Sequence, residues 1–336
     1  MSIVLSHDTA LEIYRSSLAP SANYKTVPFR LLSSPISHDV SWLRSLSAKE
    51  TNMLLHYVVP SASRRRGFRE AKSHVCGIDM EVIPLRQAAS ESFVCVVTPE
   101  VLFLQMAAKL SPIELMKLGY ELCGSYSLSD ADSEEDEEDE EEGESLGFTR
   151  RQPLTSVGKL SAYFEPLSQV RCVQKARSVL RYVVDGCASP REAELCMLLV
   201  LPCRLGGYGL GKPLVGHTDG ATRNKTSLLP GKHGPCDLLW PLAGVALEYG
   251  VEPPEAETVR RRAPKFDRRM MLGFSDIEVI PLTNQQIEQV GTLDSVVSKV
   301  ARRHGRKLRR DQHYDFFSRQ QGLREAVLGK EQSLKG

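Results

Sequence analysis

The sequence lacks the cysteine patterns that bind zinc or cross-link small secreted folds. Its 336 residues include eight cysteines, but none forms a CxxC pair and none has the cysteine–histidine spacing of a zinc finger. Several cysteines lie in apolar runs such as ELCMLLVLPC, where cysteine behaves as a small buried hydrophobic residue. We therefore expect reduced thiols and a cytoplasmic protein.

Long apolar runs are also missing. No stretch approaches the roughly 18 apolar residues of a membrane span, and the apolar part of the opening MSIVLSHDTALEIYR is too short for a signal peptide. We expect no membrane association. Aromatic residues are only 7% of the chain and do not alternate with the basic residues, which disfavours stacking on single-stranded bases.

The net charge of +1 conceals a strong internal asymmetry. Residues 129–144 hold twelve acids and no base, and the rest of the chain carries 43 basic and 30 acidic residues, a net charge of +13. Such a block cannot fold against itself, so we expect a disordered tether. It is either a solvated spacer, a competitor of nucleic acid for the basic surface, or the contact for a protein partner.

Basic residues gather between positions 260 and 310, where thirteen lysines and arginines stand against five acids. Their spacing places several guanidinium groups on one helix face, which suits phosphate contacts of low sequence specificity, although a solvated helix surface explains it equally well. DNA is the expected partner. The candidate nucleic-acid-binding residues are Arg260, Arg261, Arg262, Lys265, Arg268, Arg269, Arg302, Arg303 and Arg306.

Two acids stand across a predicted hairpin in CDLLWPLAGVALEYG. If Trp240 faces Val245 around the turn, Asp237 lies opposite Glu248, with Cβ atoms roughly 5 Å apart. Two carboxylates held this close repel each other unless a proton or a cation lies between them. We therefore predict a divalent metal site; a partner arginine or exposure at the strand end is the alternative.

A third acid precedes this hairpin on a predicted helix. In SPREAELCMLLVLP, Ser189 has the place of an N-cap, Pro190 the first helical position and Glu192 the capping-box position. Glu192 either caps the helix or reaches the pocket of Asp237 and Glu248. Two loop histidines, His217 and His233, either approach the same pocket or are solvated.

The order of these motifs resembles the restriction-endonuclease-like, PD-(D/E)XK superfamily, and is most similar to its very-short-patch-repair and AbiEi-type abortive-infection branch. The resemblance covers roughly residues 186–303 and rests on SPREAE, RLGGYGLGKP, CDLLWP, ALEYG and FDRRMMLGFSDIEVIPLTNQQ. In the last stretch Asp267, Arg268, Arg269, Thr283 and Gln286 match by place.

The resemblance implies that Asp237, Glu248 and Glu192 hold Mg²⁺ and that these acids and Gln286 are catalytic, with the metal activating water against a DNA phosphodiester. The pattern departs at Gly250, where the superfamily has lysine. The implied function is a Mg²⁺-dependent endodeoxyribonuclease, active or catalytically degenerate. The alternative is a non-catalytic nucleic-acid-binding regulator of a bacterial defence or toxin–antitoxin system.

The predicted fold class is α/β, with a C-terminal restriction-endonuclease-like mixed sheet flanked by helices and an N-terminal α+β domain. We expect two strands, in HVCGIDMEVIPL and ESFVCVVTP, followed by one or two helices. The expected divisions are an N-terminal domain 1–128, an acidic linker 129–150, a helical connector 151–185, an endonuclease-like domain 186–310 and a C-terminal tail 311–336, which is polar beyond about residue 323.

Overall fold

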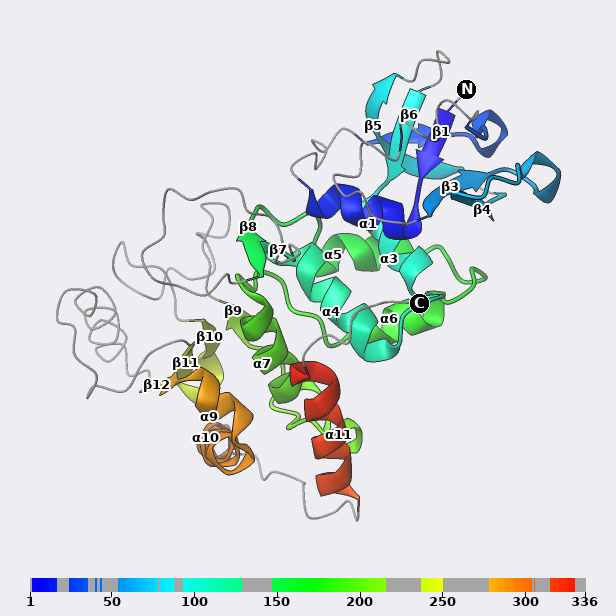
Figure 1. Cartoon of the computed structure of the whole chain (residues 1–336). Coiled ribbons are helices and arrows are strands. Elements are labelled where there is room, and N and C mark those ends of the chain that lie inside the picture. Colours follow the sequence, from blue (N-terminus) through cyan, green and yellow to red (C-terminus); the bar gives the residue numbers. More distant parts are fainter. Residues whose placement is uncertain are drawn as a thin grey trace. The chain divides into compact units, whose positions relative to one another are not determined.

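The computed structural model describes residues 2–16, 24–35, 40, 43, 54–77, 79–87, 93–128, 147–215, 237–249, 278–303, 305 and 315–329. It divides the chain into two units, both of which mix helices and strands, so the α/β class is confirmed (Figure 1). The first unit comprises Met1–Leu115, Ser127–Thr149 and Gly158–Ser178; the second comprises Met116–Tyr126, Arg150–Val157 and Val179–Gly336.

A mixed six-stranded sheet forms the first unit, in the order β2-β5-β6-β1-β3-β4. Strand β1 is central, parallel to β6 and antiparallel to β3, and β3 runs parallel to β4. The inner strands are apolar and buried, as four consecutive buried residues in β1 show. The strands are β1 (Ser2–Leu5), β2 (Lys25–Val27), β3 (Leu55–Val59), β4 (Ala71–Val75), β5 (Met80–Gln87) and β6 (Phe93–Val97).

Helix α1 packs against β3 and against α3. Inside the unit, the Tyr14 hydroxyl of α1 donates a 2.7 Å hydrogen bond to the Val97 carbonyl at the end of β6. Thr98 caps α3, and Pro99 occupies its first turn. The helical elements associated with this unit are α1 (His7–Arg15), η1 (Phe29–Leu31), η2 (Ala62–Arg64), α3 (Pro99–Met106), α5 (Val157–Phe164) and α6 (Val173–Leu180).

The second unit contains a four-stranded sheet in the order β12-β11-β10-β9. Strands β9, β10 and β11 are antiparallel neighbours, and β12 returns parallel to β11. Both faces of the β10–β11 pair are buried. The strands are β9 (Leu214–Val215), β10 (Leu238–Trp240), β11 (Val245–Tyr249) and β12 (Glu278–Leu282), and the 3₁₀ turn η4 (Pro241–Ala243) joins β10 to β11.

Helix α11 packs on α7 and η3, and α10 contacts α9 and η4. The bounds are α7 (Pro190–Val200), η3 (Cys203–Leu205), α9 (Asn284–Glu288), α10 (Val290–Arg303) and α11 (Phe316–Leu328). Three further elements lie where the chain passes between the units: α4 (Pro112–Cys123), β7 (Tyr126–Leu128) and β8 (Phe148–Arg150).

Two expectations about organisation differ from the structure. The stretch 151–185 is not a separate connector, because it is divided between the two units. The predicted C-terminal tail contains α11, which buries Phe316, Leu323 and Val327. These three side chains are spaced so that they lie on one face of a helix. The overall polarity of the segment does not reveal this pattern. Within the described residues, no helix is long and apolar enough to span a membrane.

Candidate metal centre

The register of β10 and β11 is the one expected from the hairpin sequence. Trp240 pairs with Val245, and Leu238 pairs with Leu247. Because the strands are antiparallel, one further step along each strand places residue 237 opposite residue 248. Opposed residues share a face of the sheet, so the two acids are neighbours.

Asp237 and Glu248 are both withdrawn from water. Asp237 is 9% exposed and Glu248 is 2% exposed. Asp237 Oδ2 accepts a 2.5 Å hydrogen bond from the Tyr249 backbone N–H, which fixes this carboxylate against β11. The strand pair therefore carries two buried carboxyl groups at one end.

Glu192 and Gln286 act as helix caps. Glu192 Oε2 accepts a 2.8 Å hydrogen bond from Ala188 N, and Ser189 Oγ accepts one of 3.2 Å from Glu192 N. Gln286 Oε1 and Thr283 Oγ1 form the equivalent reciprocal pair at the start of α9, at 3.0 and 3.2 Å. Of the two roles considered for Glu192, the structure shows the helix cap, and Gln286 likewise caps α9.

The predicted convergence of Glu192 on the strand acids is not found. Glu192, Asp237 and Glu248 are all described, yet among the described residues they do not form a group of three ligand atoms close enough to share one ion. The capping bonds of α7 explain this, because they direct the Glu192 carboxylate back to its own helix start. The strand pair alone remains as a candidate site for a hard cation.

Of the nine predicted nucleic-acid-binding residues, the structure describes Arg302 and Arg303. Both are exposed at the end of α10. Arg303 Nη2 lies 3.2 Å from Glu278 Oε2, and the other carboxylate oxygen of Glu278 pairs with Lys299. Helix α10 ends at Arg303, and Gly305 has φ +65°, the left-handed conformation typical of the residue after a helix end. Outside the described residues lie Arg260, Arg261, Arg262, Lys265, Arg268, Arg269 and Arg306, as well as His217, His233 and Gly250.

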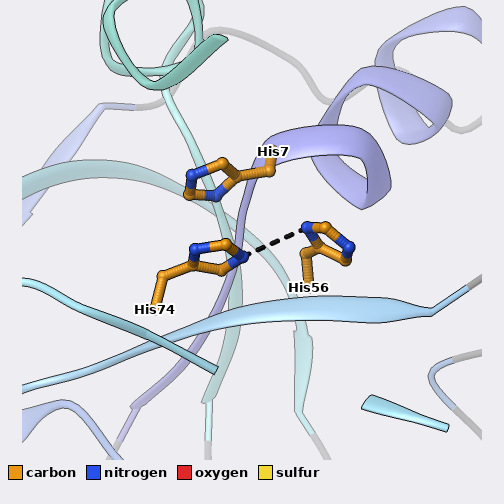
Figure 2. A group of neighbouring side chains, drawn as sticks. All are labelled: His7, His56 and His74. Carbon is orange, nitrogen blue, oxygen red and sulfur yellow. Dashed lines mark hydrogen bonds between the residues drawn. The ribbon is translucent and has the colours of Figure 1, made fainter. Parts of the chain in front are cut away.

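A cluster of three histidines lies in the first unit and was not expected from the sequence. His7 begins α1, His56 lies in β3 and His74 lies in β4 (Figure 2). Each offers one ring nitrogen, and these three nitrogens lie within 4.8 Å of one another. Among the described residues, this is the one group of three or more histidine, cysteine or acidic side chains close enough to hold one metal ion.

The imidazole rings are in direct contact. His74 Nε2 lies 3.2 Å from His56 Nδ1, and the rings of His7 and His74 stack with centroids 3.6 Å apart and planes 17° from parallel. His7 adopts φ +51°, which is uncommon for a residue other than glycine. Its backbone N–H donates to Gln105 Oε1 at 3.2 Å, a bond that helps to hold this conformation.

Polar and charged groups adjoin the cluster. Asp8 Oδ2 lies 3.7 Å from His56 Nδ1, and both Asp8 oxygens lie 2.9 Å from Lys109 Nζ. Ser6 Oγ lies 3.0 Å from His7 Nδ1. When this hydroxyl accepts from Nδ1–H, the lone pair of the ring lies on Nε2. An outer contact of this kind commonly fixes the tautomer of a ligand histidine.

Burial lowers the pKa of all three imidazoles. Loss of water is the largest cause, and it brings the pKa of His7 to about 3 and that of His74 to about 4. The pKa of His56 is also lowered, while the Asp8 carboxylate opposes the shift in each ring. The histidines are therefore neutral at neutral pH, which is the form that binds a metal.

The sequence contains only a weak signal for this cluster. His56 lies in the apolar run LHYVV, and His74 begins HVCGIDMEVIPL, in which we expect a strand. In the structure β4 pairs in parallel with β3, and His56 is opposite Lys72, so His74 lies two positions further along the same face. The cluster depends on the pairing of β3 with β4 and on the packing of α1, and both bring together residues that are far apart in the sequence.

Comparison of the chain with models of protein families, with curated proteins and with solved structures gives no match in any of the three.

Proposed function

We propose that the second unit is a nucleic-acid-binding unit of the restriction-endonuclease-like type and that Asp237 and Glu248 bind a divalent cation such as Mg²⁺. The order of its elements supports this proposal. Helix α7 precedes three antiparallel strands, and a fourth strand, β12, runs parallel to the third. This order agrees with part of what the motif resemblance implies; the helix that it implies before the fourth strand lies outside the described residues.

The observation that carries the proposal is the position of the two acids within this order. Asp237 immediately precedes the second strand and Glu248 lies in the third, where the register makes them neighbours. At roughly 5 Å and an effective dielectric constant near 20, two full charges repel by about 3 kcal/mol. A divalent cation turns this repulsion into attraction, and one or two carboxylates with substrate phosphate are the ligands that suit Mg²⁺.

Three features favour a second candidate function, in which this unit binds nucleic acid without cleaving it. Gly250 occupies the position where the resembled pattern has lysine, so the group that would stabilise the attacking water is missing there. Glu192 and Gln286 are committed to helix caps. The unit would then act as a regulatory platform, as in a bacterial defence or toxin–antitoxin system.

Metal binding is tested by thermal unfolding of the full chain in EDTA and in millimolar Mg²⁺ or Mn²⁺. A cation that binds only the folded form raises the Tm. Asp237→Asn should abolish most of that rise, because it removes one charge while the amide oxygen can still accept from Tyr249 N. Glu165→Gln, at an exposed position of the first unit, is the matched control and should respond like the wild type.

Function is tested on the same proteins with duplex DNA. Metal-dependent cleavage that Asp237→Asn removes would establish the nuclease, whereas salt-dependent binding without cleavage would establish the regulator. Arg302→Gln should weaken binding more than Arg181→Gln, an exposed arginine elsewhere in the second unit. A chain that neither responds to Mg²⁺ or Mn²⁺ nor binds duplex DNA at low salt would rule out both candidates.

A further inference from the structure

The histidine cluster has the donor spacing of a transition-metal site. Zn²⁺ binds histidine nitrogen at about 2.0–2.1 Å, so two ligands of a tetrahedral ion lie about 3.3 Å apart. The 3.2 Å between His74 Nε2 and His56 Nδ1 agrees with this value. The third ring belongs to His7, at the start of a helix that packs on β3, so all three donors are held by packed elements of one unit.

A purely structural role explains the cluster less well. Three imidazoles in contact contain six ring nitrogens, and the described contacts between them comprise one hydrogen bond, between His74 Nε2 and His56 Nδ1. The ring of His7 is stacked on His74, a contact that brings two basic groups together without a shared proton. His7 also retains an uncommon backbone conformation, which places its side chain in this cluster.

We propose that His7, His56 and His74 form a binding site for one Zn²⁺ ion, with a fourth position open to water or to an anionic ligand. Three neutral nitrogen donors suit Zn²⁺ rather than Mg²⁺, which prefers oxygen. Three protein ligands with an open position are typical of catalytic rather than structural zinc sites. His7 and His74 remain partly accessible to solvent, so a fourth ligand can reach the ion.

The neighbouring groups complete this site. Asp8 brings a negative charge to within 3.7 Å of His56 Nδ1, which offsets part of the charge of a dication held by neutral ligands. The ion pair with Lys109 keeps Asp8 in place. When Ser6 Oγ accepts from His7 Nδ1–H, the lone pair of that ring lies on the other nitrogen, Nε2. The proposal concerns the first unit alone and is independent of the function proposed for the second.

The test uses the full chain after EDTA treatment and dialysis. Titration with Zn²⁺ should give one tightly bound ion per chain and a raised Tm. His7→Asn and His74→Gln should each weaken binding more than about 100-fold, above the range that loss of an outer contact costs. Asparagine is chosen because it tolerates positive φ. Glu165→Gln, at an exposed position of the first unit outside the cluster, is the control and should bind like the wild type.

Co²⁺ gives a second measurement that needs no variant. In the wild type it should produce the intense visible absorption of a four- or five-coordinate ion without a thiolate charge-transfer band, and Zn²⁺ should displace it. Absence of tight Zn²⁺ binding by the wild type, or unchanged binding in folded His7→Asn and His74→Gln, would overturn the proposal. If both variants fail to fold, a six-coordinate Co²⁺ spectrum or one with thiolate absorption would overturn it.

Discussion

Acid should destabilise the metal-free first unit through its histidines. The pKa of His7 is lowered to about 3 and that of His74 to about 4, from 6.5 in the unfolded chain, because both are buried. As the pH falls below 6.5, these histidines are protonated in the unfolded chain but stay neutral in the folded unit. Stability is therefore fully present above pH 6.5 and is lost progressively down to the folded pKa values.

The size of this loss follows from the linkage relation. One histidine that is protonated only when unfolded costs about 1.4 kcal/mol per pH unit well below its unfolded pKa. Without screening by solvent, two such histidines would lower the free energy of unfolding by roughly 3 kcal/mol between pH 6.5 and about pH 5. His74 is partly exposed to solvent, so water screens part of the shift of its pKa, and we expect a loss of about 2 kcal/mol for the pair.

Amide hydrogen exchange measured by mass spectrometry in EDTA provides the assay. Peptides that cover β3 and β4 report the opening free energy of the first unit, and peptides from α7 serve as an internal reference from the second. His74→Gln should reduce the acid sensitivity of the β3 and β4 peptides by roughly 1 kcal/mol over this range, because glutamine does not titrate. If wild type and variant lose protection equally as the pH falls, the reasoning about these histidines is refuted.

Two further changes have definite expected outcomes. Gly206→Ala should lower the Tm and reduce the free energy of unfolding by roughly 1–3 kcal/mol, because φ is +88° and an added Cβ would lie 2.3 Å from the Arg319 carbonyl oxygen. Gly67→Ala is the control, because the space around Gly67 is open. Equal Tm values for the two variants would contradict the prediction. Deletion of residues 129–144 should tighten duplex DNA binding at low salt, because twelve negative charges are removed, and the effect should fade as salt screens it. An unchanged DNA affinity at low ionic strength would identify the block as a plain spacer.

Features governed by neighbouring residues could be predicted from the sequence. The Ser189–Pro190–Glu192 cap and the hairpin register of Trp240 with Val245 both follow the prediction. Each depends on positions only a few residues apart, where capping geometry or turn length leaves few alternatives. Apolar residues at helical spacing likewise predicted one or two helices where the structure has α3 and α4.

Features that depend on distant pairing could not be predicted. Strand β1 at the chain start pairs with β6, whose residues lie about ninety positions later, and this pairing makes β1 central. The histidine cluster needs β3, β4 and α1 together. The role of Glu192 was left open for a related reason, since the sequence places a carboxylate in the first helical turn but does not decide whether it turns back to Ala188 or outward.

The two candidate metal sites differ in donor chemistry, so the metal itself can tell them apart. Asp237 and Glu248 offer only oxygen, which Mg²⁺ and Mn²⁺ accept, whereas the histidine cluster offers only nitrogen, for which Zn²⁺ is far preferred over either. Zn²⁺ also binds carboxylates, so a zinc response alone does not assign a site. A magnesium response that depends on Asp237 and a zinc response that depends on His74 would be independent observations, one for each unit of the chain.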